Sequence, residues 1–201
     1  MADQVHDNKL VSIQLLRALA SAYVSVAHMA WAFADHVGEG LGFSQEDTQY
    51  GQVAVAVFFV VSGYIMVVSS ARMFGQPGAT RAFWTRRAVR ILPPYWLATA
   101  GLVFWLLFLG IAVDAGRVVQ SLFFIPFWEG GGSLRYTPIL WPGWTLFYEL
   151  FFYFLFGLFL ALGRVRTVLA TSAVLTALSL ASLVVQPEIA LIYFITQPIL
   201  L

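Results

Sequence analysis

The sequence predicts an all-α fold, a polytopic transmembrane helix bundle. Hydrophobic residues make up 60% of the chain and charged residues only 10%, whereas a soluble domain carries about 25% charged residues. The apolar stretches are continuous and long enough to cross ~30 Å of hydrocarbon as helices, without the alternation of a membrane barrel. A soluble core cannot bury that much apolar surface, so we expect the chain to lie in a membrane.

The net charge of +1 and the absence of cysteine exclude several classes of function. A chain with no overall positive field is not expected to bind nucleic acid. Without cysteine there are no disulfides, no thiol nucleophiles and no cysteine-ligated metal sites. His6 and His36 have no metal-ligand spacing, so we expect no metal site and no permanently bound cofactor.

Five stretches are long enough to span a bilayer, and a sixth is shorter. The complete spans are predicted near residues 10–34, 50–71, 91–113, 143–162 and 167–185. The sixth stretch, near residues 189–201, has about a dozen apolar residues, fewer than the ~20 that a span needs. We therefore expect about five complete spans plus a truncated sixth, in the N-terminal part of a longer domain.

The first span carries an arginine and a histidine where a lipid-facing helix should carry neither. Arg17 and His28 are eleven residues apart, so both point to nearly the same face of a helix. That face also holds Gln14, Ser21, Ser25 and Asp35, while most of the rest is apolar, with Leu15, Leu16, Leu19, Ala20 and Val26. An arginine at bilayer depth costs at least ~2.5 kcal/mol, so it needs a partner, a cavity or an anionic ligand. This polar stripe is the leading candidate site.

Basic residues predict an N-terminus in the cytoplasm, because lysine and arginine accumulate in short cytoplasmic loops. One side of the membrane receives Lys9, Arg72, Arg81, Arg86, Arg87, Arg90, Arg164 and Arg166, against Arg117 and Arg135 on the other. The acidic segment 35–47 and the segment 114–142 are then expected outside. Arg17 falls in the inner half of the bilayer and His28 in the outer half.

The second candidate site is a cluster of three arginines before the third span, Arg86, Arg87 and Arg90. If this segment is helical, the three share an arc of about 100° at the cytoplasmic edge and suit a phosphate ligand. The same cluster also suits simple anchoring to anionic lipid headgroups. Pro93 and Pro94 are expected to begin a helix rather than to interrupt one.

The third candidate site lies on the fourth span, where Thr145, Glu149 and Tyr153 follow one another at intervals of four residues. Glu149 is predicted about 9 Å below the outer end of this helix, near the depth of His28. A carboxylate beside a histidine fixes its tautomer and raises its basicity, as a general base requires. Asp35 is a rival partner for His28, and a hydrogen bond that only joins helices is the structural alternative.

Weaker signals concern small and aromatic residues. Ser62 and Gly63 are expected to allow close helix packing, because the pattern of a nucleophile elbow is missing. Trp144 belongs to a group of aromatic residues that could stack on a sugar, although an interfacial aromatic belt explains them equally well. Trp144, Tyr148 and Asp35 are the candidate substrate-binding residues.

Four ordered motifs resemble the acyltransferase 3 family of integral-membrane proteins, and among them the bacterial exopolysaccharide-production acyltransferases. The motifs are residues 15–20 with His28, 58–66, 86–96 and 143–149. The resemblance implies that residues 1–201 belong to a single acyltransferase domain that crosses the bacterial inner membrane several times. It also implies transfer of an acyl group, usually acetyl, from cytoplasmic acyl-CoA to a hydroxyl of a polysaccharide or lipid-linked sugar.

The resemblance further implies roles for individual residues. The arginine and histidine tied to activity in the family correspond to Arg17 and His28. The arginine-rich motif, which is thought to receive the nucleotide end of the donor, gives an acyl-CoA-binding role to Arg86, Arg87 and Arg90.

These roles combine into a mechanistic hypothesis in which His28, Glu149 and Arg17 form the catalytic group. The pantetheine arm of acyl-CoA passes Arg17, and the thioester arrives near His28. His28 then either deprotonates the sugar hydroxyl or accepts the acyl group itself. A transporter or flippase, in which the same three residues line a polar pathway, is the alternative. A non-enzymatic scaffold in polysaccharide export is a third possibility.

Overall fold

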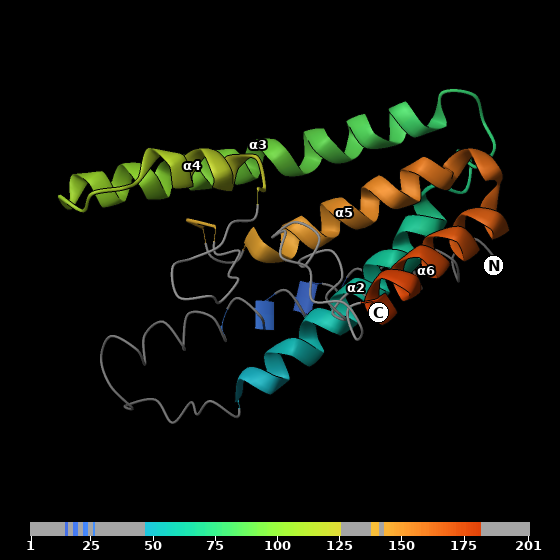
Figure 1. Ribbon diagram of the computed structural model, residues 1–201, viewed down its shortest axis with the longest axis horizontal. Coiled ribbons are helices and arrows are strands. Elements are labelled where there is room, and N and C mark those ends of the chain that lie inside the picture. The colour runs from blue at the N-terminus through green and yellow to red at the C-terminus, as the bar shows by residue number, and fades with distance from the viewer. Residues whose placement is uncertain are drawn as a thin grey trace. The chain divides into compact units, whose positions relative to one another are not determined.

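The computed structural model describes residues 15, 18, 19, 22, 23, 26, 47–125, 138–140 and 143–181 (Figure 1). Every regular element in this part of the chain is helical, as the composition predicts. The elements are α2 (Asp47–Ser69), α3 (Ala79–Phe108), α4 (Ala115–Leu122), α5 (Trp144–Phe159), the 3-10 helix η2 (Leu160–Leu162) and α6 (Arg164–Ala181). They fall into two compact units, residues 1–69 and 70–201.

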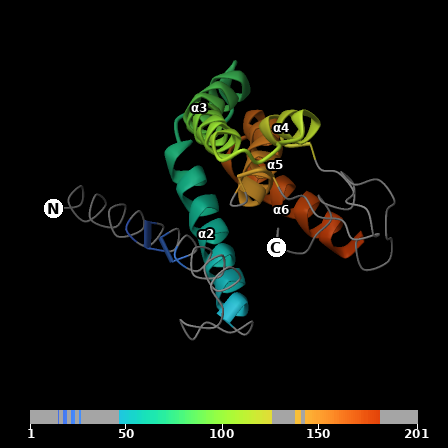
Figure 2. The same cartoon turned by 90° about the vertical axis from the view of Figure 1, so that its left-hand side faces the viewer.

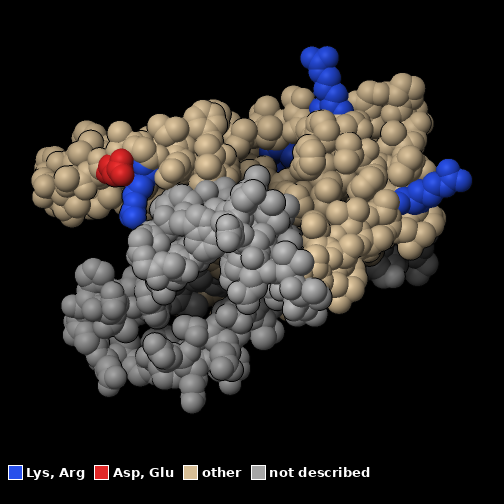
Figure 3. All heavy atoms as spheres, viewed as in Figure 1, with Lys and Arg blue, Asp and Glu red and all other residues tan. Residues whose placement is uncertain are grey.

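Three helical segments of the described chain are long and apolar enough to cross a membrane: Ala79–Phe108, Trp144–Leu162 and Arg164–Ala181. Figure 3 shows the described atoms of one face as almost wholly uncharged, with few basic or acidic side chains. Both observations are typical of a helical membrane protein. The total number of spans and the cytoplasmic N-terminus stay predictions.

In the first unit, the described residues of the first predicted span are helical and exposed. Leu15, Leu19 and Val26, of the predicted apolar face, are each 59% exposed. The next helix, α2, covers nearly the range predicted for the second span. On it Ser62 is 3% exposed, and its hydroxyl has no hydrogen-bond partner among the described residues.

In the second unit, α3 begins twelve residues before the predicted span and contains Pro93 and Pro94 in its interior. The prediction that these prolines begin a helix is therefore wrong. The chain enters α3 through Gly78, whose left-handed backbone (φ 74°) suits glycine. Each proline removes one donor of the helical ladder. Contacts of α3 flank the two prolines: Trp84, before them, bonds to α5, and Tyr95 and Trp96, after them, bond to residues 121 and 122.

Helix α5 packs between α3 and α6, as Figures 1 and 2 show from two directions. It runs antiparallel to α3, because Thr80 Oγ1 donates to the Gly157 carbonyl (2.9 Å) near one end. At the other end, Gly143 lies beside the ring of Tyr95. Between these ends, Trp84 Nε1 donates to the Tyr153 carbonyl at 3.2 Å. With η2, this helix matches the predicted span 143–162 closely.

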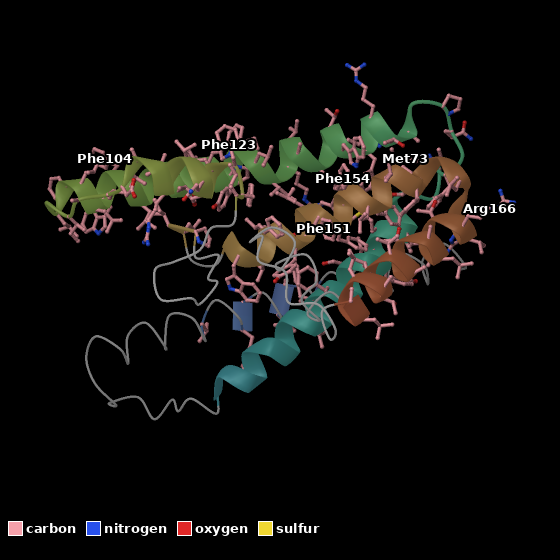
Figure 4. The ribbon with its side chains drawn as sticks, viewed as in Figure 1. Met73, Phe104, Phe123, Phe151, Phe154 and Arg166 are labelled. Carbon is pink, nitrogen blue, oxygen red and sulfur yellow. The ribbon has the colours of Figure 1, made fainter. Side chains whose placement is uncertain are left out.

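Aromatic rings fill the contact between α3 and α5. Trp84 stacks on Phe154 with ring centroids 5.5 Å apart and an interplanar angle of 9°. Figure 4 labels Phe154 on the side of α5 that faces α3. Phe83 and Phe156, 2% and 1% exposed, meet at 5.5 Å and form the centre of this core. The two helices are therefore held in one register by large, well-packed side chains.

The predicted outer segment 114–142 contains α4, a short helix that the sequence analysis did not anticipate. Asp114 caps it, because its Oδ1 accepts from the backbone N–H of Gly116 at 2.7 Å. The helix folds back along α3 (Figure 1). There the Tyr95 hydroxyl donates to the Ser121 carbonyl (3.1 Å), and Trp96 Nε1 donates to the Leu122 carbonyl (3.0 Å).

Helix α6 follows η2 and packs on α5. Its buried face carries hydroxyl side chains, Thr167, Thr171 and Ser179, together with Leu175. Thr167 Oγ1 lies 2.8 Å from the carbonyls of both Phe159 and Gly163, which ties the start of α6 to the end of α5. Arg166, the residue before Thr167, is exposed and extends away from the helices (Figure 4).

We expect Gly157→Ala to destabilise the protein, because α3 and α5 touch at this glycine. A Cβ at Gly157 would lie 2.2 Å from Nε1 and 2.7 Å from Cδ1 of Trp84, and the indole is fixed by its stacking on Phe154. Such overpacking costs about 1–3 kcal/mol. The measurement is the apparent melting temperature of the detergent-solubilised protein. The control is Gly101→Ala in α3, where a Cβ would meet nothing within 4 Å; it should not lower that temperature.

Candidate functional site

Glu149 lies in the middle of α5 and is only 6% exposed. The Tyr153 hydroxyl, one turn along the helix, donates to Oε1 of the Glu149 carboxylate. The interval of four residues thus produces the side-chain contact that the sequence predicts. Burying a carboxylate is costly unless charges or hydrogen bonds compensate it, so this position is typical of a functional group.

Arg87 of α3, the facing helix, lies beside Tyr153, the hydrogen-bond partner of Glu149. The central carbon of its guanidinium lies 5.3 Å from the ring centroids of both Phe83 and Tyr153. Those two rings meet edge to face, with centroids 6.2 Å apart and planes at 89°. A guanidinium within about 6 Å of an aromatic face is attracted by the ring's electrons, and more strongly when water is excluded.

The structure therefore joins two candidate sites that the sequence analysis separated. The predicted depths of the two residues in the membrane, Arg87 at the cytoplasmic edge and Glu149 in the outer half, stay predictions. Since α3 starts at Ala79, the arginines lie within the helical segment that packs along α5. The antiparallel register then brings Arg87 to Tyr153, one turn from Glu149.

The other two arginines of the cluster have different surroundings. Arg86 and Arg90 are exposed, whereas Arg87 is half-buried. Arg86 Nη1 lies 3.9 Å from Sδ of Met73. The helical conformation that the predicted arc of about 100° requires is present. The cluster thus presents two guanidinium groups outward and one inward.

The candidate substrate-binding residues of α5 lie at its first turns. Tyr148 is 4% exposed and Trp144 is half-buried. The Tyr148 ring meets the rings of Trp144 (6.1 Å) and Phe147 (5.9 Å) edge to face. Thr145 is half-buried beside them in the sequence. A role for Trp144 and Tyr148 in binding a sugar stays a prediction.

The candidate residues of the first span, Arg17 and His28, lie outside the described residues, and so does Asp35. Their predicted roles stay predictions. Within the described ranges, no three histidine, aspartate or glutamate side chains gather as metal ligands would. The candidate site residues that the structure does describe lie on α3 and α5: Arg86, Arg87, Arg90, Trp144, Tyr148 and Glu149.

Helical periodicity places Tyr153 in line with Glu149, but it connects neither residue to Arg87 or Phe83. The missing signal was the register between α3 and α5. Its one trace in the sequence is Gly157, whose missing side chain leaves room for the Trp84 indole. No local pattern predicts that pairing.

Comparison with known proteins gives the same family that the motifs resemble. A family model described as an acyltransferase domain, the acyltransferase 3 model, matches residues 10–196. The exopolysaccharide production protein ExoZ of Rhizobium meliloti (strain 1021) is 37% identical over 154 residues, which are 75% of this chain and 47% of that protein. The chain thus spans about half the length of the curated relative it matches. No solved structure matches it. Because the family model covers nearly all of its 201 residues, this chain belongs to the acyltransferase 3 family.

Proposed function

We propose that the protein is a membrane-bound O-acyltransferase that moves an acyl group, acetyl in the first instance, from cytoplasmic acyl-CoA to a hydroxyl of an exported polysaccharide. The observation that carries the proposal is the buried Glu149 carboxylate, held by Tyr153 between apolar helices in a chain of this family. The polysaccharide acceptor is suggested by the name of the relative, an exopolysaccharide production protein.

The proposed reaction is a proton transfer coupled to acyl transfer. His28, oriented by Glu149 or by Asp35, takes the proton of the sugar hydroxyl. The oxygen then attacks the thioester carbonyl, the bond from carbon to sulfur breaks, and the thiolate of CoA leaves and is protonated. In the variant with an acyl-enzyme, His28 is acylated first and the sugar oxygen attacks the acyl-imidazole.

Arg17, Arg86 and Arg90 would supply positive charge to the donor. The exposed guanidinium groups of Arg86 and Arg90 suit bidentate contacts with phosphate oxygens. Because both side chains are exposed on α3, a ligand can contact them without entering the interface between α3 and α5. Arg17 would meet the donor further along the first span.

We expect Arg86→Gln and Arg90→Gln each to raise the KM for acetyl-CoA about 10-fold, because each removes a charge-assisted contact of ~1.5 kcal/mol or more. The kcat of both variants should stay near that of the wild type, since a contact kept from ground state to transition state does not change it. Arg166→Gln, on α6 and directed away from the bundle (Figure 4), is the control. A KM unchanged in Arg86→Gln and Arg90→Gln would contradict the phosphate-binding role.

The experiment that tests the proposed function measures release of free CoA from acetyl-CoA by the full-length protein in membrane vesicles. Polysaccharide acceptor is added to one sample and omitted from another, and vesicles without the protein are the control. Acceptor-dependent release supports acyl transfer. Absence of release with acetyl-CoA and with succinyl-CoA overturns it, and movement of substrate across the vesicle membrane without CoA release would indicate transport instead.

A further inference from the structure

Arg87, Tyr153 and Glu149 form one continuous line of contacts across two helices. The Arg87 guanidinium of α3 lies over the Tyr153 ring of α5, 5.3 Å from its centroid. The hydroxyl of the same tyrosine donates to the Glu149 carboxylate. A positive charge at one end is thus linked to a negative charge at the other through a single tyrosine.

The tyrosine at the centre of this line is held in place from several directions. It is 4% exposed, and its ring meets Phe83 edge to face and Phe152 at a tilt, with centroids 6.2 Å and 6.1 Å away. Its backbone carbonyl accepts from Trp84 Nε1 at 3.2 Å. A side chain fixed in this way presents its O–H in one direction.

Glu149, in contrast, has a side chain with three rotatable bonds and a carboxylate that could turn. The Tyr153 hydroxyl donates to one of its oxygens, and this hydrogen bond restrains the rotation of the carboxylate. A group that must orient a histidine needs such support, because misplacement by about 1 Å can cost ~100-fold in rate.

The surroundings of Arg87 favour a role inside the protein over a role in donor binding. A half-buried guanidinium needs a partner, and the Phe83 and Tyr153 rings supply one for Arg87. Arg86 and Arg90, its neighbours in the cluster, are exposed. Of the three arginines, these two have a guanidinium that is accessible to a phosphate ligand from outside the helix pair.

We propose that Tyr153 and Arg87 are positioning residues: Tyr153 fixes the Glu149 carboxylate for acyl transfer, and Arg87 fixes the Tyr153 ring. The inference rests on the proposed function and deepens it. It replaces the expectation that all three arginines of the cluster bind the donor phosphates. The roles divide within one motif, with Arg86 and Arg90 acting on KM and Arg87 acting on kcat.

The test begins with single variants of the full-length protein in membrane vesicles, assayed for acceptor-dependent CoA release. Tyr153→Phe keeps the ring under Arg87 but removes the O–H, and should lower kcat roughly 10- to 100-fold while the KM for acetyl-CoA is unchanged. Arg87→Gln should give the same pattern, in contrast to the raised KM of Arg90→Gln. Arg87→Lys, which keeps a positive charge over the ring, should recover most of the lost kcat.

A control separates positioning from folding. Tyr95→Phe also removes a buried hydroxyl, one that donates to the Ser121 carbonyl between α3 and α4. It should lower the melting temperature and leave the kcat of the folded protein unchanged. If Tyr153→Phe and Arg87→Gln behave like Tyr95→Phe, their role is structural and the inference is overturned.

The double variant Arg87→Gln with Tyr153→Phe tests whether the two residues act in series. If Arg87 acts through Tyr153, the double variant is no slower than Tyr153→Phe alone, within about twofold. Multiplied losses would show independent roles and contradict the inference. Failure of the proposed function can be told from failure of this inference. A wild-type protein that releases no CoA overturns both. An active wild type with unimpaired Tyr153→Phe overturns only this inference.

Discussion

Replacing His28 with alanine is expected to abolish acceptor-dependent CoA release in membrane vesicles. Under the proposed function, His28 is the group that accepts either the hydroxyl proton or the acyl group. Loss of a general base costs about 100- to 10,000-fold, and loss of an acyl acceptor stops the covalent route altogether. The measurement compares the initial rate of CoA release at saturating acetyl-CoA, normalised to the amount of protein in the membrane.

The control variant is His6→Ala, which removes a histidine from the segment before the first predicted span and should keep the wild-type rate. Membrane insertion of His28→Ala is checked by its amount in the membrane fraction and its elution as a single species after solubilisation. A properly inserted His28→Ala that still transfers acyl groups at the wild-type rate would rule out His28 as base and as acyl carrier.

The second prediction concerns Glu149→Gln, which should lower kcat about 100-fold or more. Glutamine has the size of glutamate and still offers an oxygen to the Tyr153 hydroxyl, so the contact between the two residues can persist. It lacks the negative charge that orients a histidine and stabilises its protonated form. The loss should therefore be in kcat, with a nearly constant melting temperature and a nearly constant KM for acetyl-CoA.

Asp114→Asn is the matched control, because it removes a carboxylate charge from the exposed cap of α4. Asparagine caps a helix about as well as aspartate, so neither activity nor stability should change. Wild-type kcat in Glu149→Gln would make the buried carboxylate a structural group only. Asp35, the rival partner of His28, would then be the next residue to replace.

The local chemistry of α5 could be predicted from the sequence because it depends on helical periodicity. A repeat of 3.6 residues places Glu149 and Tyr153 one turn apart wherever the helix lies. The range of α5 with η2 also follows from an apolar stretch that ends near a glycine, Gly163. The all-helical character of the described chain is also confirmed. It could be predicted because the composition excludes a soluble core and the apolar stretches have the length of membrane-spanning helices.

Three features depended on contacts between segments distant in the sequence. Helix α3 continues through Pro93 and Pro94, although a local reading of those prolines favours a helix start. Helix α4 forms within a segment predicted as an outer loop, and it is held by hydrogen bonds from Tyr95 and Trp96. For α3, tertiary packing overrides the local preference, whereas α4 combines a local cap at Asp114 with these long-range hydrogen bonds.

The third of these features bears most on function: Arg87 of the arginine cluster lies beside Tyr153, the hydrogen-bond partner of Glu149. Periodicity fixes which residues share a face of one helix, but it does not say which turns of two helices face each other. That register is set by the fit of Trp84 against Gly157 and of Tyr95 against Gly143. The sequence therefore identified both groups of residues, and only the packing of α3 on α5 joined them into one site.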